Sequence, residues 1–218
     1  FKAPDLLKSY RYHEIYVVIQ LKYMKNSKIL IGVGAVILVL LLLVLGSYNS
    51  LVQKDQAVTA SWAQVETDYQ RRSDLVPNLV ATVKGAANFE SSTLTAVVEA
   101  RAKATSIQID ASTLTSENIA AYEKAQSGLS GALGKLLAIA EAYPTLTATE
   151  SFRGLQTQLE GTENRIAVSR KDFNNAVKSY NTSIKTFPNA LIAPMFGFAP
   201  KAYFEAAEGS ETAPEVNF

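Results

Sequence analysis

Cysteine is absent from the 218-residue chain, and histidine occurs once, as His13. The lack of cysteine excludes disulfides, thiolate zinc sites, iron–sulfur clusters and cysteine nucleophiles. Serine–histidine catalysis and histidine-rich metal sites would both have to depend on His13, so we expect neither. The chain also has no large excess of charge of either sign, because its 21 lysines and arginines are balanced by 20 aspartates and glutamates, which gives a net charge of +1. That balance argues against a protein that binds nucleic acid through its phosphates.

The chain is nevertheless rich enough in apolar residues, at 48%, to form a core. The near-neutral total conceals an asymmetry along the sequence. Residues 1–45 contain six bases and two acids, whereas residues 46–218 contain 15 bases and 18 acids. A basic amino-terminal end and a mildly acidic body indicate two different environments.

The segment Ile29–Leu45 consists of 17 residues without a polar side chain. As a helix it would rise about 25 Å, and extension to Tyr48 approaches the ~30 Å hydrocarbon core of a bilayer. A cleaved signal peptide is the alternative. Its apolar core is usually about 7–15 residues long and is followed by a small-residue cleavage site, whereas here no Ala-x-Ala follows and helical periodicity resumes at once. We therefore favour an uncleaved anchor.

The charges flanking this segment predict its orientation. Lys22, Lys25 and Lys28 precede it, and Lys54 is the first charge after it. The positive-inside rule then places the amino terminus in the cytoplasm and the large carboxy-terminal body outside, in the bacterial inner membrane.

The start of the chain differs from the rest. Met24 with its basic flank is typical of a natural start, so we interpret residues 1–23 as non-native or as a short cytoplasmic tail. Residues 24–48 form the predicted anchor with its basic flank. Residues 49–207 form the predicted bundle, and residues 208–218 are expected to be disordered.

A 3-4 spacing of apolar residues from Tyr48 to Val83 predicts that the anchor continues into a long helix. Pro77 would either kink this helix or mark a fresh start capped by Ser73. Further helices are expected at about 90–106, 116–143 and 149–186, the last two ended by prolines. Short connections favour antiparallel neighbours, so the predicted fold is all-α: an amino-terminal transmembrane helix continuous with an antiparallel up-and-down bundle of about four long helices.

Three glycines, Gly128, Gly131 and Gly134, lie inside the third of these helices. Each weakens a helix by about 1 kcal/mol relative to alanine, so we expect a close helix–helix approach to offset the loss. No strand precedes them, which argues against a phosphate-binding loop.

Several charged residues fall within the helical pattern and are the candidate structural or partner-contact residues. Arg72 occupies a core position, so its guanidinium requires either a carboxylate or several carbonyls, and the candidate acids are Asp74 and Glu163. The interpretation we favour is a buried or half-buried ion-pair network that fixes helix register. The alternative is a ligand or partner site. The full set of candidates is Arg71, Arg72, Asp74, Asn78, Arg101, Glu163 and Arg170, with Arg165 beside them.

A catalytic carboxylate pair, Glu160 and Glu163, is conceivable at this spacing, but solvated helix faces carry most such pairs. A di-iron bundle would need Glu-x-x-His, and the bundle has no histidine. We therefore expect no enzyme activity, no metal and no cofactor.

Several blocks of sequence closely resemble the LemA family of bacterial membrane proteins, over about residues 24–204. They are Tyr48–Val52, Arg71–Val80, Thr82–Gly85, Glu99–Arg101, Leu155–Glu160, Thr162–Ile166, Asn174–Val177, Tyr180–Ile184 and Phe187–Pro188. The resemblance implies an amino-terminal anchor and an antiparallel helical bundle, and it implies no enzyme activity.

These observations predict a non-enzymatic scaffold or adaptor of the bacterial envelope. Its expected partners are the lipid bilayer and either other proteins or further copies of itself, with no nucleic acid and no small-molecule substrate. Two alternatives stay open: an accessory subunit of an envelope enzyme such as a membrane metalloprotease, and an oligomer that shapes the membrane.

Overall fold

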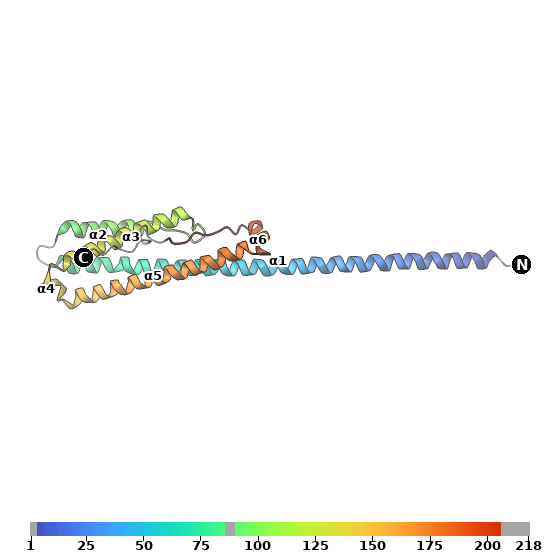
Figure 1. The fold of residues 1–218 in the computed structure, drawn as a ribbon, viewed down its shortest axis with the longest axis horizontal. Helices are drawn as coiled ribbons and strands as arrows, with labels where there is room; N and C mark the ends of the chain where they lie inside the picture. The colour runs from blue at the N-terminus through green and yellow to red at the C-terminus, as the bar shows by residue number, and fades with distance from the viewer. Residues whose placement is uncertain (1–3, 86–89, 206–218) are drawn as a thin grey trace, which may run out of the picture. The chain divides into compact units, whose positions relative to one another are not determined.

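A computed structural model describes residues 4–85 and 90–205, with side chains placed for residues 30–85 and 90–205. Within these ranges all regular secondary structure is helical (Figure 1). The elements are α1 (Pro4–Lys84), α2 (Ser91–Ser106), α3 (Ser116–Ala140), α4 (Pro144–Thr147), α5 (Glu150–Lys185), α6 (Asn189–Ile192) and the 3-10 helix η1 (Ala193–Phe196). The predicted all-α class with four long helices is confirmed. The predicted disordered tail, residues 208–218, lies outside the described residues.

The chain divides into two compact units, Phe1–Asn49 and Ser50–Phe218, and α1 contributes to both. In the first unit, the apolar side chains from Leu30 to Leu45 are mostly exposed, as illustrated by Ile31 at 72%. An 18-residue window here has a mean hydropathy of 2.9, and none of it is buried. By length and composition this is a helix that can cross a membrane.

In the second unit, α1 buries one stripe of side chains at the predicted spacing. The buried members are Leu51, Val58, Trp62, Val65, Tyr69, Arg72, Val76, Leu79 and Val83. The prediction of a fresh start at Ser73 is wrong, because α1 continues through Pro77 to Lys84. The contact that permits this continuation is described below.

Side-chain caps define where the other long helices begin. α3 is capped by the hydroxyl of Thr115, whose oxygen accepts from the backbone N–H of Asn118. α5 is capped in the same way by Thr149. α3 ends at Ala140, earlier than predicted, and the short helix α4 then starts at Pro144.

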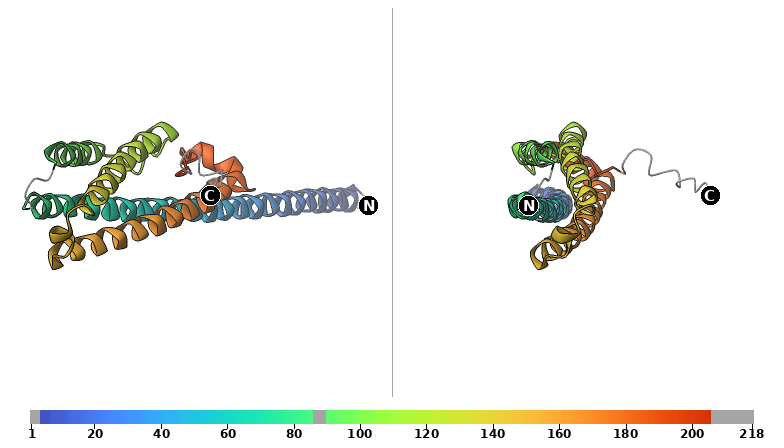
Figure 2. Two further views of the ribbon diagram at one scale, coloured as in Figure 1. Left: turned by 60° about the vertical axis from the view of Figure 1, so that its left-hand side comes forward. Right: turned by 90° about the vertical axis from the view of Figure 1, so that its left-hand side faces the viewer.

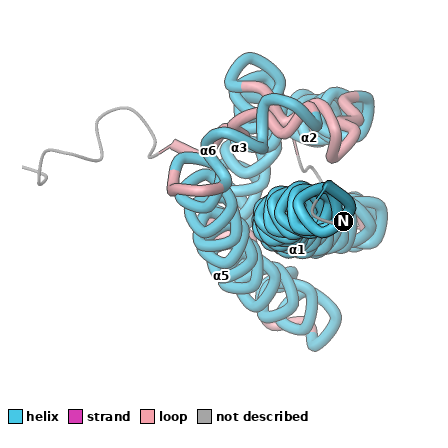
Figure 3. The backbone as a smooth tube through the Cα atoms, turned by 90° about the vertical axis from the view of Figure 1, so that its right-hand side faces the viewer, coloured by secondary structure: helices cyan, strands magenta, loops and turns pink. Residues whose placement is uncertain are grey.

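Two layers of helices enclose the core of this unit. α5 runs along the Ser50–Lys84 part of α1, and α2 and α3 lie side by side (Figures 1 and 2). Seen along α1, α5 lies on one side of that helix and the α2–α3 pair on another (Figure 3). The core centres on Trp62, whose ring contacts Tyr122 of α3 at 5.3 Å and Phe173 of α5 at 5.4 Å between centroids.

Two details of the predicted faces are wrong. Val98 stands on the apolar side of the predicted helix 90–106 and Phe187 at the end of the apolar face of the predicted helix 149–186, but they are 50% and 83% exposed. The three glycines of α3 do not mark a close approach either, because a Cβ added at Gly128, Gly131 or Gly134 would meet no other atom within 4 Å. Their side of α3 faces open space.

Candidate functional site

Arg72 of α1 is the most deeply buried charged residue among those described, at 1% exposure. Its Nη1 donates to Glu163 Oε1 of α5 at 2.8 Å and also to the hydroxyl of Ser130 on α3. Arg72 therefore connects three helices, and Glu163 is its partner of the two candidate acids. The other candidate, Asp74, is exposed and accepts instead from Gln70 Nε2 at 2.7 Å.

Gln126 of α3 completes the surroundings of this guanidinium, and no pattern in the sequence pointed to it. Arg72 Nη2 donates to the Gln126 backbone carbonyl at 2.9 Å and to its side-chain oxygen at 2.7 Å. Gln126 Nε2 in turn donates to the Ala104 carbonyl of α2 at 3.1 Å. The guanidinium carbon lies 5.0 Å from the centre of the Tyr69 ring, a cation–π contact. Arg72 Nε has no hydrogen-bond partner among the described residues.

Arg101 of α2 accounts for the continuity of α1 through Pro77. A proline has no N–H to offer the carbonyl four residues earlier, which here belongs to Ser73. Arg101 Nε donates to this Ser73 carbonyl at 2.8 Å. The arginine therefore replaces the bond that Pro77 removes, and it fastens α2 to α1 at that point.

Arg170 of α5 lies apart from the Arg72 network. It pairs with Glu123 of α3, donates to the Glu205 carbonyl at 3.1 Å and stacks 4.7 Å from the centre of the Phe204 ring. Glu163 and Arg170, both on α5, therefore have different ion-pair partners, Arg72 and Glu123.

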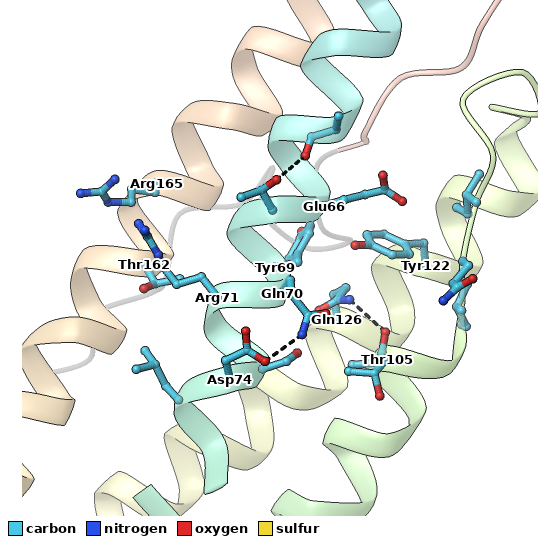
Figure 4. A pocket seen from close by; sticks show the side chains of 18 of the residues that line it. Glu66, Tyr69, Gln70, Arg71, Asp74, Thr105, Tyr122, Gln126, Thr162 and Arg165 are labelled. Carbon is cyan, nitrogen blue, oxygen red and sulfur yellow. Dashed lines mark hydrogen bonds between the residues drawn. The ribbon is translucent and has the colours of Figure 1, made fainter. Parts of the chain in front are cut away.

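The remaining candidates, Arg71, Asp74 and Asn78, are exposed on the outer face of α1. They line a groove of about 1500 Å³, called here the outer groove (Figure 4). One wall is α5, with Gln158, Gly161, Thr162 and Arg165, and the other is the end of α2 with the following segment 105–110.

Charges in the outer groove are arranged by side. Figure 4 shows Arg71 extending towards α5, where Arg165 also lies, and Glu66 extending towards Tyr122 on the opposite side. Asp110 lines that opposite side as well. Arg71 and Arg165 thus lie at one edge of the groove and Glu66 and Asp110 at the other, and Asp74 adds a third carboxylate to the lining.

Hydrogen bonding and burial shift the pKa values of several groups that line this groove. Burial raises the pKa of the Glu66 carboxyl and of the Tyr69 phenol. The Ser112 side chain and backbone N–H, the latter at 2.7 Å from Oδ1, hold the pKa of the Asp110 carboxyl below its ordinary value. This carboxylate is consequently charged at neutral pH. Burial raises the pKa of Tyr122, so its phenol stays protonated. Among the described residues no group of three or more His, Cys, Asp or Glu side chains is placed to bind a metal ion.

The groove and the network both lie in the part of the chain that a family comparison covers. A sequence model of the LemA family matches residues 61–218, more than half of the chain. The chain belongs to the LemA family. The resemblance seen in the sequence is confirmed.

Individual relatives match the chain over segments of different length. Protein LemA of Metamycoplasma hominis is 23% identical over 163 residues, which cover 75% of this LemA-family chain and 71% of that protein. Magnetosome protein MamQ 1 of Paramagnetospirillum magneticum and magnetosome protein MamQ of Magnetospirillum gryphiswaldense are each 35% identical over 88 residues, or 40% of this chain. The matched segment spans about a third of the MamQ proteins, 32% of each. None of these descriptions names an enzyme activity.

Proposed function

We propose that this LemA-family protein is a non-enzymatic, membrane-anchored scaffold of the bacterial envelope, whose bundle binds a protein partner through the outer groove. The observation that carries the proposal is the exposed apolar run from Leu30 to Leu45, followed in the same helix by a folded helical unit. Such a run has no stable place in water, and a bilayer covers it.

The orientation belongs to the same proposal. Three lysines before the run and the mixed charges after it favour a cytoplasmic amino terminus. The bundle and its groove then lie on the extracytoplasmic side.

The charge arrangement of the outer groove supports a protein as its occupant. Arg71 and Arg165 lie at one edge, and Glu66 and Asp110 at the other. A nucleic acid or an anionic lipid surface would be repelled by the carboxylate edge. A partner helix with acids along one side and bases along the other complements both edges.

A site-specific cross-link tests the groove. A photo-activatable residue at Asn78, in the full-length protein in its native membrane, should give one discrete protein adduct. The double charge reversal Arg71→Glu with Arg165→Glu should abolish that adduct, because the basic edge that attracts the acids of the partner then repels them.

The matched control reverses two exposed charges of α5 outside the groove, Lys171→Glu with Lys178→Glu, and should leave the adduct unchanged. Equal loss in both double variants, or no adduct at all in native membranes, would show that the groove is not the partner site. An adduct between two copies of this chain would show that the groove mediates self-association, and the proposed adaptor role would be wrong.

A further inference from the structure

The segment from residue 198 to residue 205 lies outside the helices, yet its backbone is extensively hydrogen-bonded. Eight of its main-chain groups have partners, and six of these eight are bonded by side chains of α5. The bonded groups are Phe198 N, Ala199 O, Lys201 N and O, Ala202 N, Phe204 N and O, and Glu205 O. Backbone-directed contacts of this kind are those that proteins make to a bound extended peptide.

Two asparagines of α5 make four of these bonds. Asn181 accepts from Lys201 N at 3.0 Å and donates to Lys201 O at 2.7 Å. Asn174 accepts from Phe204 N at 2.9 Å and donates to Phe204 O at 3.0 Å. Each amide thus pairs with both main-chain groups of one residue, as a neighbouring strand would.

The spacing of these pairs matches a helix to an extended chain. Asn174 and Asn181 are two turns apart on α5, a rise of about 10.5 Å. Lys201 and Phe204 are three residues apart, about 10 Å in extended backbone. The two asparagine side chains of α5 are therefore separated by the same distance as Lys201 and Phe204 in an extended peptide that runs antiparallel to the helix. Tyr180 adds a bond to Ala199 O at 2.9 Å.

Two side chains of the segment, Phe204 and Lys201, make specific contacts with the rest of the protein. Phe204 is 5% exposed, and its ring stacks 5.8 Å from Trp62 and meets Phe173 edge-on at 5.3 Å. Lys201 Nζ lies 2.8 Å from Asp55 Oδ1 of α1 and also donates to the Ala111 carbonyl at 3.2 Å. The surroundings therefore select a basic residue followed three positions later by an aromatic one.

We propose that this face of α5 and α1 is a binding site for an extended peptide with a basic residue three positions before an aromatic one. Its occupant in trans is the 198–205 segment of a second copy of this chain, exchanged between neighbours. The inference concerns a different face from the outer groove and holds whether or not that groove binds a partner.

Exchange between copies would change the backbone only at the turn that precedes the segment. This turn is at Gly197, whose φ of +78° glycine adopts without strain and whose N–H donates to the Pro194 carbonyl at 3.4 Å. Every contact made by the segment within one copy would form identically between two copies, as in domain swapping. Anchoring in a membrane raises the effective concentration of neighbouring copies.

A peptide-binding experiment with the full-length protein in detergent tests the site. The variant Phe204→Ala weakens the resident segment and leaves the site intact. A fluorescent peptide with the sequence of residues 198–205 should bind this variant saturably and raise its Tm. Binding should be at least tenfold weaker for the wild-type protein, whose own segment competes, and for a peptide that carries alanine at the Phe204 position.

The control removes the amides, in the triple variant Phe204→Ala, Asn174→Ala, Asn181→Ala, and should lower peptide affinity at least tenfold. Absence of binding to a folded Phe204→Ala protein, or equal binding to the triple variant, would overturn the proposal.

A charge exchange tests the second copy and does not depend on the Phe204→Ala variant folding. Asp55→Lys alters the site, and Lys201→Asp alters the segment. Differently tagged full-length chains carrying one change each should form mixed complexes several-fold more than either variant alone, because the pair re-forms only between copies. Both changes in one chain should return assembly to the wild-type level. A mixture that assembles no better than its separate variants would overturn exchange between copies.

Discussion

Arg72 and Glu163 form an ion pair whose two members differ sharply in exposure, the arginine being 1% and the glutamate 46% exposed. Removing Arg72 and removing Glu163 should therefore have different effects on stability. Without Arg72, the carbonyl and side-chain oxygens of Gln126 lose their donor inside the protein, whereas Glu163 regains water. Without Glu163, Arg72 keeps its bonds to Gln126 and Ser130.

This asymmetry sets the first prediction, which urea unfolding of the full-length protein in detergent can measure. Arg72→Ala should lower the free energy of unfolding by about 3 kcal/mol, through lost packing and stranded polar groups. Arg72→Met should lose less, since it refills the volume. Glu163→Gln should lose less than Arg72→Ala, because the amide oxygen can still accept from Arg72, but more than the roughly 1 kcal/mol of an exposed pair, because the buried guanidinium loses its carboxylate. Equal losses for Arg72→Ala and Glu163→Gln would contradict this account of the network.

The contact between Arg101 and the Ser73 carbonyl gives a second prediction, in the form of a double-mutant cycle. Arg101→Met should destabilise the wild-type protein by about 1 kcal/mol, the usual value of one hydrogen bond. In a Pro77→Ala background the same change should matter less, because the new alanine supplies the helical N–H to the Ser73 carbonyl. A coupling free energy of about 0.5 kcal/mol or more between the two sites is expected, and strict additivity would rule the explanation out.

Gly131 and Gly134 of α3 lie where a methyl group meets nothing within 4 Å. Gly131→Ala and Gly134→Ala should each raise the free energy of unfolding by about 0.5–1 kcal/mol, because alanine is the better helix former. Gly197→Ala is the contrasting variant, since its φ of +78° disfavours a side chain. It should destabilise by about 1–2 kcal/mol. A loss of stability in the α3 variants would show that something packs against that face.

Tyr180 contributes to the alkaline limb of the stability profile, together with Tyr69 and Tyr122, whose pKa values burial also raises. Burial first, and the Asp55 carboxylate second, raise the pKa of Tyr180 from 10.0 to about 12. The unfolded chain loses this proton at lower pH than the folded protein, so the stabilisation is present below pH 10 and is lost as pH rises through about 12. Tyr180→Phe should therefore flatten the fall in Tm between about pH 10 and pH 12. An unchanged slope in Tyr180→Phe would show that another group governs this limb.

Much of the fold was predictable because the helices carry a regular apolar stripe with prolines and caps near their ends. Leu51 to Val83 occupy the predicted face of α1 almost without exception. The choice at Pro77 between a kink and a fresh start at Ser73 could not be made from the sequence, because the compensating donor, Arg101, comes from another helix. Gln126 was not predictable for the same reason. A glutamine in the middle of a helix has no sequence pattern of its own, and its role depends on a contact with Arg72 of another helix.

The candidate site was predictable only in part. Burial of Arg72 followed from its position in the stripe, and Glu163 followed from the need for a carboxylate. The separation of Arg71, Asp74 and Asn78 onto an exposed face follows from the same helical periodicity. The roles of Asn174 and Asn181 were not predictable, since their partners are backbone groups of a segment with no periodic pattern of its own.

The central claim, a membrane-anchored bundle outside the cytoplasm, is tested most directly by labelling single cysteines in intact cells. The natural absence of cysteine makes each introduced thiol the only target of a maleimide on this chain. A cysteine replacing the exposed Lys178 of α5 should react with a membrane-impermeant maleimide in intact cells, and one at position 25 should react only after lysis. Labelling at position 25 and protection at position 178 before lysis would contradict the account.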